Sequence, residues 1–193
     1  PRRLSEPMLV EVQKQIAALL AQGVIRKSSS PFAFPIVMVK RVGSPKLRLC
    51  LDYKLQNDQT EPFPFPIPDI REQLDRLAGK QFYCSLDCAS FFHEFEIVEE
   101  HRAFTAFVTP WGQKLQWRRV PFGLKNAPAH CQKQFQELLA KSGNPLLQDI
   151  IPYFDDCAFG ANSIDELCLK FEALLAIAVK HGLKFKESKC VLG

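Results

Sequence analysis

The spacing of apolar positions divides the chain into helical and extended segments. Over residues 8–22, apolar side chains recur every three or four positions, which predicts a helix, with Ser5 as its cap and Gly23 as its stop. Over residues 81–87, apolar and polar positions alternate, which predicts a strand that ends at Asp87. The same criteria predict further helices over 70–78, 128–141 and 164–181, and further strands over 35–42, 46–53, 94–97, 104–108 and 114–120.

A proline-rich segment interrupts this pattern. Over residues 61–68, proline alternates with bulky apolar residues, and proline lacks the N–H group that a central strand must donate. The segment is therefore expected to be an extended connector between two subdomains. Helices and antiparallel hairpins follow one another along the chain, so we expect an α+β fold in which an antiparallel sheet is backed by helices.

Composition and charge narrow the class of protein. The chain has 193 residues, of which 47% are hydrophobic and 24% are charged, as in a globular protein with one sizeable core or two small subdomains. Its formal charge of +4 is compatible with a nucleic-acid partner without requiring one. No apolar run is long enough to span a bilayer and no signal peptide opens the chain, so we expect no membrane partner.

The seven cysteines do not follow the spacing of a zinc site. None belongs to a CxxC pair, and although Cys84, Cys88 and His93 lie close together in sequence, no second half-site accompanies them. Free, mostly buried thiols in a reducing compartment are the better interpretation.

The strongest candidate for chemistry is the segment Tyr153-Phe154-Asp155-Asp156, which has apolar residues on both sides. Burying an ionised carboxylate is costly unless it is compensated, and Mg²⁺ is the usual partner of carboxylates and substrate phosphates. Asp87 ends a different predicted strand, 68 residues before Asp155, and is the best third carboxylate. Ordinary turn residues are the alternative at both places. Other acids have the pattern of a solvated face: Glu94, Glu96, Glu99 and Glu100.

Six segments, in the order in which they occur, resemble motifs of reverse transcriptases, above all those of gypsy-type LTR retrotransposons. Together they extend over nearly the whole chain. The resemblance implies an RNA-directed DNA polymerase built as a right hand, of which fingers and palm lie in this chain. The segments are Ser28–Phe32, Arg48–Tyr53, Phe65–Pro68, Leu86–His93, Val120–Pro128 and Tyr153–Asp156.

The resemblance also implies a division of the chain. Residues 1–68 form the fingers with the proline-rich connector, 69–99 form palm, 100–126 return to the fingers with the nucleotide-pocket loop, and 127–193 complete the palm. The thumb and RNase H are absent from this chain, which is expected to be an excerpt of a longer Pol polyprotein. The implied partners are the rest of that polyprotein, dNTPs, and an RNA or DNA template with its primer. The implied location is intracellular, either cytoplasmic or within virus-like particles.

The implied metal site uses the acidic residues. Asp87 and Asp155 would bridge two Mg²⁺ or Mn²⁺ ions, Asp156 would complete the cluster, and the main-chain oxygen of Cys88 would be an extra ligand. Lys189 matches a lysine proposed in the family to protonate pyrophosphate, and a solvated tail lysine is the alternative.

The implied nucleotide site uses residues from the fingers. Arg48, with either Lys40 or Arg41, matches the cations that clamp the triphosphate, and an exposed hairpin with solubilising charge is the alternative. Phe92 matches a steric gate that selects dNTP over rNTP, and a core residue is the alternative.

A loop and a set of cations are expected to meet the nucleic acid. Phe122 and Gly123 match the loop that lies against the incoming nucleotide and the template base, and Gly123 permits close approach of the main chain. The residues expected at primer and template are Tyr153, Phe154, Arg119 and Lys125, with Arg118 and Lys133 as further candidates.

The sequence departs from the family pattern near the carboxylates. Phe154 stands where smaller aliphatic residues are usual and would crowd the primer end, and Pro152 indicates an edge strand or a bulge. Lys54 and Gln56 replace residues that are more often arginine and leucine. Two other functions therefore stay open: a catalytically idle nucleic-acid-binding or interaction module derived from a retroelement, and a different palm-type nucleotidyltransferase such as a cyclase.

Overall fold

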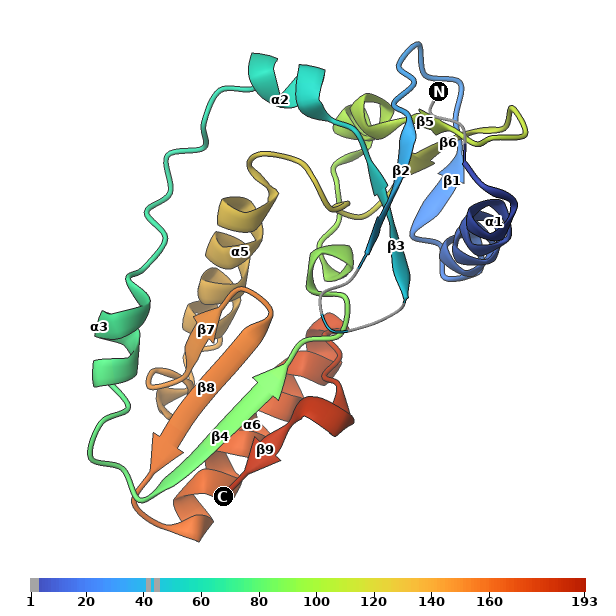
Figure 1. The fold of residues 1–193 in the computed structure, drawn as a ribbon. Coiled ribbons are helices and arrows are strands. Elements are labelled where there is room, and N and C mark those ends of the chain that lie inside the picture. Colours follow the sequence, from blue (N-terminus) through green and yellow to red (C-terminus); the bar gives the residue numbers. More distant parts are fainter. Residues whose placement is uncertain (1–3, 41–42, 44–45) are drawn as a thin grey trace. The chain divides into compact units, whose positions relative to one another are not determined.

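In the computed structural model, which describes residues 4–40, 43 and 46–193, the chain forms two units, each built from two separate segments (Figure 1). Unit 1 consists of Pro1–Pro62 and Phe95–Ala127, and unit 2 consists of Phe63–Glu94 and Pro128–Gly193. The chain first leaves unit 1 inside the proline-rich segment, which forms no helix or strand, as expected of an extended connector. The crossings lie within a few residues of the boundaries expected for fingers and palm, and that naming of the units stays a prediction.

Unit 1 combines two antiparallel sheets with helices packed against them. Its elements are α1 (Glu6–Ala21), β1 (Ile25–Lys27), β2 (Ile36–Lys40), β3 (Leu47–Leu51), α2 (Lys54–Gln59), α4 (Glu99–Arg102), η2 (Ala103–Thr105), β5 (Phe107–Val108) and β6 (Lys114–Trp117). Strands β1, β6 and β5 form one sheet in that order, and β2 pairs with β3 in the other. The apolar face of α1 buries Val12 and Ile16 in a core that includes Leu49 and Trp117, so the predicted amphipathic helix is confirmed.

Helix α1 is also joined to β3 by a side chain that acts as a strand partner. The Gln15 Nε2 donates to the main-chain oxygen of Leu47 (2.8 Å), and the Gln15 Oε1 accepts from the main-chain N–H of Leu49 (2.9 Å). These bonds satisfy main-chain groups on the side of β3 that does not pair with β2.

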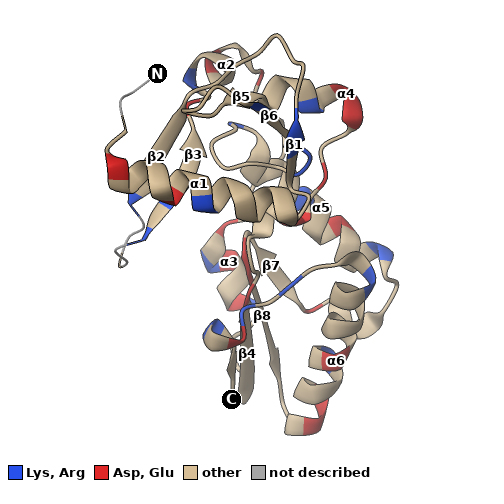
Figure 2. Ribbon diagram, turned by 90° about the vertical axis from the view of Figure 1, so that its right-hand side faces the viewer, with Lys and Arg blue, Asp and Glu red and all other residues tan. Residues whose placement is uncertain are grey.

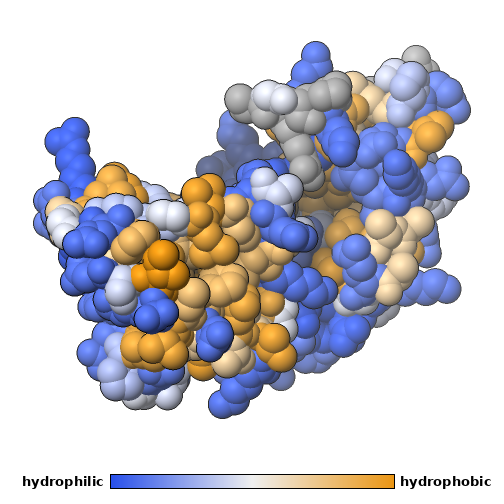
Figure 3. Space-filling model, turned by 90° about the horizontal axis from the view of Figure 1, so that it is seen from below, coloured by the Kyte–Doolittle hydropathy of each residue, from blue (hydrophilic) through white to orange (hydrophobic). Residues whose placement is uncertain are grey.

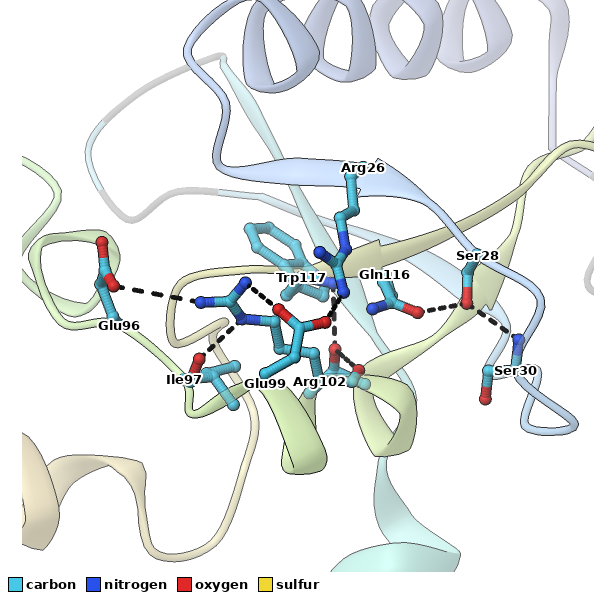
Figure 4. Close-up of polar contacts among 10 residues, drawn as sticks. Arg26, Ser28, Ser30, Glu96, Ile97, Glu99, Arg102, Gln116 and Trp117 are labelled. Carbon is cyan, nitrogen blue, oxygen red and sulfur yellow. Dashed lines mark hydrogen bonds and ion pairs between the residues drawn. The ribbon is translucent and has the colours of Figure 1, made fainter.

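A network of ion pairs connects the short helices of unit 1 to β1. Figure 4 shows Glu99 between two arginines, where its carboxylate accepts from Arg26 and, at 2.6 Å, from Arg102. The Arg102 Nε donates to the main-chain oxygen of Ile97 (2.7 Å). Glu96 forms an ion pair with Arg119 at 3.3 Å. Glu96 and Glu99 are therefore partners of arginine rather than members of a purely solvated face.

Unit 2 is an antiparallel sheet with two long helices on one face (Figure 1). Its elements are α3 (Ile70–Asp75), β4 (Phe82–Asp87), η1 (Phe91–Glu94), α5 (Ala127–Lys141), η3 (Pro145–Leu147), β7 (Ile151–Tyr153), β8 (Asp156–Ala161), α6 (Ile164–His181), η4 (Glu187–Lys189) and β9 (Val191–Leu192). The strand order is β7-β8-β4-β9, and every pair is antiparallel. The fold class expected from the sequence, an antiparallel sheet backed by helices, is confirmed. Pro152 has no N–H group to donate to a neighbouring strand. Because β7 lies at the edge of the sheet, no hydrogen bond between central strands is lost.

The ends of α6 follow their sequence signals. The Ser163 Oγ accepts from the Glu166 N–H (3.1 Å), and the Glu166 carboxylate accepts from the Asn162 N–H (2.9 Å). Gly182 ends the helix with φ +74, a conformation that glycine adopts without strain.

Three strand predictions are wrong, one because no strand forms and two because the strand is shorter than expected. Residues 94–97 form no strand, because residues 91–94 are the 3₁₀ helix η1 and Glu96 makes a single bridge with Arg119. Their alternation has another cause: Ile97 packs against the core of unit 1, while Glu96 forms ion pairs at the surface. The strand expected over 104–108 begins only at Phe107, because η2 occupies the preceding residues. The strand expected over 114–120 ends at Trp117.

The surface contains both charged and apolar residues. Figure 2 shows lysine and arginine dispersed along the ribbon and mixed with acidic residues, so the charge of +4 is not concentrated in one element. Figure 3 shows apolar side chains gathered over part of the molecule seen from below. Unit 2 exposes Tyr83, Val191 and Leu192 by 41%, 63% and 57%. Within the described part of the chain, no helix has both the length and the apolar character needed to span a membrane.

Candidate active site

The hairpin formed by β7 and β8 presents two carboxylates at its tip. Tyr153 pairs with Asp156, so the loop between the strands consists of Phe154 and Asp155. Phe154 has φ +52, whereas Asp155 is not among the residues with positive φ. A two-residue loop with positive φ at its first position resembles a type II′ turn, which favours glycine there. A phenylalanine in this conformation is strained by about 1–3 kcal/mol, so the surrounding structure must hold the turn.

The third carboxylate lies beside this turn. Asp87 is the last residue of β4 and pairs directly with Asp156 on β8. Directly opposed residues of an antiparallel pair have Cβ atoms about 5 Å apart, so the two carboxylates extend from neighbouring positions. The main-chain N–H of Cys88 donates to the main-chain oxygen of Asp155 (2.6 Å) and joins the end of β4 to the turn. Three acids from two distant stretches of sequence therefore meet at one end of adjacent strands.

Two lysines bind the buried carboxylate. The Asp87 side chain is 9% exposed, and its oxygens accept hydrogen bonds from Lys186 and, at 2.6 Å, from Lys189. Burial by itself would raise the pKa of Asp87, but the hydrogen bonds and charges of the two lysines hold it below the usual value. The same contact raises the pKa of Lys189. Lys189 is thus a partner of Asp87 rather than a free tail lysine, although its side chain is 59% exposed.

The remaining two acids experience the crowding of negative charge. The pKa of Asp156 is raised, first by burial of its carboxyl group and then by the nearby charges of Asp155 and Asp87. The residue as a whole is nevertheless exposed. As the side chains stand, no three His, Cys, Asp or Glu residues in the described part of the chain are arranged to hold a metal ion. The donor set still fits a divalent cation, because crowded carboxylate oxygens are the ligands that Mg²⁺ and Mn²⁺ prefer. Such a cation would have to replace the lysines at Asp87.

Cys88, the residue after Asp87, is a candidate metal ligand through its main-chain oxygen and not through its thiol. Cys88 is 1% exposed, and burial followed by the neighbouring carboxylates raises the pKa of its thiol to about 12. Because Mg²⁺ prefers oxygen ligands, the main-chain oxygen rather than this buried thiol is the candidate ligand. All seven cysteines are free, as expected from the sequence.

Two phenylalanines follow the carboxylate strand. Phe91 is 3% exposed and packs on Phe135, with ring centroids 5.8 Å apart, so it is the core residue. Phe92 is half-buried, with its ring centroid 5.7 Å from that of Phe91. Phe92 and Asp87 belong to the same unit, and the assignment of Phe92 as a steric gate stays a prediction.

A second group of predicted site residues lies within unit 1. The Arg48 guanidinium lies over the Phe122 ring, 4.3 Å from its centroid. Gly123 has φ +99, and a Cβ there would lie 3.4 Å from the main-chain oxygen of Leu51. The structure therefore explains why glycine stands at this position and places three of the predicted nucleotide-site residues together.

Of the two other cations expected at the triphosphate, the one that the structure describes does not join this group. Lys40 pairs with Leu47 and lies one position from Val39, the partner of Arg48, so Lys40 projects from the opposite face of the ribbon. Arg41, the other candidate, lies outside the described residues.

The cations expected at primer and template have partners within unit 1. Arg119 pairs with Glu96, and the Lys125 Nζ donates to the main-chain oxygen of Thr60 (2.8 Å). Their assignment to nucleic acid stays a prediction. The side chain of Asn57 holds the same loop, because it donates to the main-chain oxygen of Gly123 (2.7 Å) and accepts from the N–H of Lys125 (2.8 Å).

Sequence reasoning missed three polar residues that organise these sites. They are Asn57, Lys186 and Gln132, of which Gln132 is fully buried on α5. A signal existed for Gln132, because it shares the helix face of Phe135 and Leu139, where an apolar residue would be expected. No comparable signal distinguished Asn57 or Lys186 from other surface residues.

One cavity of unit 2 lies apart from the carboxylates. It has a volume of about 440 Å³ and is lined by residues that include Arg76, Leu147, Gln148 and Pro152. Asp87, Asp155 and Asp156 do not line it.

Comparisons with known proteins agree with this arrangement. A family described as reverse transcriptase (RNA-dependent DNA polymerase) matches residues 25–193. The chain is 33% identical over 192 residues to the retrovirus-related Pol polyprotein from transposon 297 of Drosophila melanogaster, with 97% of this chain and 18% of that protein covered. It is 30% identical over 193 residues to the corresponding polyprotein from transposon gypsy, with 94% and 18% covered. The foamy viral protease-reverse transcriptase in complex with an RNA/DNA hybrid matches with a TM-score of 0.87 and 25% identity, over 99% of this chain and 25% of that one.

The antiparallel sheet backed by helices, with acids at the ends of adjacent strands, is thus the fold of the fingers and palm of a right-hand polymerase. The chain belongs to the reverse transcriptase family, as the motifs in its sequence indicated. It spans about a fifth of the length of the two curated relatives named above.

Proposed function

We propose that the chain is the nucleotidyl-transfer part of an RNA-directed DNA polymerase encoded by an LTR retrotransposon. The observation that supports this most directly is the pairing of Asp87 with Asp156 across β4 and β8, with Asp155 in the adjoining turn. Family membership supports the reaction class, and the sequence relatives support an origin within a Pol polyprotein. The thumb and RNase H segments of such a polyprotein are the proposed partners of this chain.

The acidic cluster is the proposed metal site. Asp87, Asp155 and Asp156, with the main-chain oxygen of Cys88, would hold two Mg²⁺ or Mn²⁺ ions. Such ions, when bound, activate the primer 3′-hydroxyl and neutralise charge on the triphosphate and the departing pyrophosphate. Lys189, which binds Asp87 in the present structure, is the proposed proton donor to the pyrophosphate once a cation has replaced it at that carboxylate, because an ammonium group can donate a proton.

The residues of unit 1 are proposed to bind the nucleotide. Arg48 stacks on Phe122, and the terminal N–H groups of its guanidinium are proposed to bind phosphate oxygens, which bind such planar donors well. Gly123, where φ is +99 and the main chain approaches Leu51 closely, is proposed to lie against the base. Phe92, from unit 2, is the proposed gate against the ribose 2′-hydroxyl.

A primer on an RNA or DNA template is the proposed nucleic-acid partner. Tyr153 and Phe154 at the hairpin tip would meet the primer end, and Arg119 and Lys125 would approach the template phosphates after exchanging their present partners. The foamy viral protein named above was seen with an RNA/DNA hybrid, which supports this choice. A location inside cells or virus-like particles remains a prediction.

A second function is favoured by one observation. Both oxygens of Asp87 are bound to lysines, which would also suit a nucleic-acid-binding module that no longer uses metal. The two functions differ in whether the acids are needed for chemistry or only for folding.

Primer extension separates the two functions. The chain, within a longer polyprotein segment, is supplied with a primed RNA template, dNTPs and Mg²⁺ or Mn²⁺. Asp155→Asn should abolish incorporation without lowering stability, because it removes one of several crowded anions. Asp165→Asn, at an exposed position of α6, is the control and should incorporate normally. Normal incorporation by the Asp155 variant would refute its proposed role, and no incorporation by the unchanged protein would favour the idle module.

A further inference from the structure

A buried glutamine binds the turn that holds two of the three carboxylates. Gln132 lies on α5 with 0% of its surface exposed. Its Nε2 donates to the main-chain oxygen of Pro152 (2.7 Å), and its Oε1 accepts from the main-chain N–H of Phe154 (2.6 Å). These two groups lie on either side of Tyr153, so the carboxamide fixes the main chain immediately before Asp155.

The two main-chain groups point away from the sheet. β7 is an edge strand, and Tyr153 pairs with Asp156 on β8. Because main-chain groups of successive residues alternate between the partner strand and the open side, those of Pro152 and Phe154 face the open edge. Gln132 therefore supplies the donor and the acceptor that a further strand would otherwise supply.

The turn needs such support because of its conformation. Phe154 has φ +52, where glycine is at ease and other residues persist only if their surroundings hold them. The rings of Tyr153 and Phe154 pack edge to face with centroids 4.9 Å apart, which fixes the side chains. The bonds from Gln132 fix the main chain itself.

The same arrangement recurs at the strand that contains Arg48. There Gln15 donates to the main-chain oxygen of Leu47 and accepts from the N–H of Leu49, at 2.8 and 2.9 Å. In both units a glutamine from a helix bridges the oxygen of one residue and the N–H of the second residue after it. The residue between the two bonded positions is Tyr153 in one case and Arg48 in the other. Tyr153 is proposed above to meet the primer, and Arg48 is proposed to bind the nucleotide.

We propose that Gln132 is a positioning residue: it holds Phe154 in the left-handed conformation and thereby sets how Asp155 and Asp156 lie relative to Asp87. This inference rests on the metal site of the proposed function. Partners that orient metal ligands without touching the metal typically change metal affinity by about 10- to 100-fold when they are removed. Loss of Gln132 should therefore weaken metal binding even though its side chain is not a ligand.

The test uses Gln132→Met on the full chain, because methionine keeps the length of the side chain and removes both hydrogen bonds. Gln134→Met, at an exposed position of the same helix, is the matched control. Mn²⁺ affinity is measured by calorimetry and the exchange rate of the Phe154 amide proton by NMR. Q132M should bind Mn²⁺ about tenfold more weakly and exchange the Phe154 amide faster, whereas Q134M should change neither.

A second substitution gives a result that a merely structural role would not produce. Phe154→Gly removes the strain at the turn, because glycine adopts positive φ freely. The double variant Q132M/F154G should therefore regain most of the Mn²⁺ affinity that Q132M loses. If Q132M does not fold, Gln132→Asn replaces it, since asparagine keeps the carboxamide but withdraws it by one methylene.

The outcomes distinguish this inference from the proposed function. Wild-type Mn²⁺ affinity in a folded Q132M, or a loss that F154G does not repair, overturns the positioning role. If the unchanged chain binds no Mn²⁺, the proposed metal site fails instead. In that case the Phe154 amide still decides the matter, because equally slow exchange in Q132M and in the unchanged chain would show that Gln132 does not hold the turn.

Discussion

Asp87 offers a direct way to test whether the lysines occupy the place of a metal ion. Its side chain is 9% exposed, and both of its oxygens bind ammonium groups, from Lys186 and Lys189. A divalent cation that binds Asp87 must replace these groups. Removing one of them by Lys186→Met should therefore tighten the binding of Mn²⁺.

The size of the effect follows from the burial of the pair. A hydrogen bond to a charged group contributes roughly 1.5–3 kcal/mol when water is excluded. The Lys186 side chain is 41% exposed, so solvent screening reduces this contribution. About 1 kcal/mol remains, which corresponds to a roughly fivefold lower Kd for Mn²⁺ in K186M. The same loss should lower the free energy of unfolding in EDTA by about 1 kcal/mol, so affinity and stability change in opposite directions.

Calorimetry with Mn²⁺ and denaturant unfolding in EDTA measure the two quantities. Lys184→Met is the matched control, because it removes the same charge from an exposed position in the same segment. K186M should exceed K184M in Mn²⁺ affinity and fall below it in stability. An affinity for K186M that equals or falls below that of K184M would refute the idea that Lys186 stands in the place of the cation.

Three further substitutions test other contacts. Gly123→Ala forces a side chain onto φ +99 and should lower the free energy of unfolding by about 1–2 kcal/mol and raise the KM for dNTP; unchanged values would contradict this. Phe92→Ala should raise rNTP incorporation relative to dNTP by about tenfold in primer extension, and unaltered sugar discrimination would count against the gate. Lys170→Met removes an ammonium group that is 3% exposed and should cost about 1–3 kcal/mol in chemical unfolding, whereas Lys180→Met, at an exposed position of α6, should cost little. Equal stability of the two lysine variants would show that the buried contacts are not stabilising.

Local sequence signals were sufficient where neighbours along the chain set the structure. The capping box at Ser163 and the glycine at 182 marked both ends of α6, and both function as expected. Pro152 indicated an edge strand, and β7 is one. These signals work because caps, turns and prolines act on main-chain groups within a few residues of themselves.

Local signals failed where a distant partner was needed. Alternation over residues 94–97 predicted a strand, but Ile97 alternates with its neighbours because it packs on the core of unit 1. The period of a sequence records which side chains are buried, and here the pairing with a neighbouring segment is limited to a single bridge.

The candidate site shows the same division. Order and spacing of residues along the chain were enough to single out Asp87, Asp155 and Asp156, because acids that follow apolar strands are unusual and matched a known family. The direct pairing of Asp87 with Asp156, the lysines on Asp87 and the glutamine behind the turn emerged from the folded chain alone. Gln132 lies more than twenty residues from the Phe154 that it binds, and Lys186 lies 99 residues from Asp87. Which polar side chain reaches a given main-chain group or carboxylate depends on how helices and strands pack in space, and neither propensity nor periodicity encodes that distance.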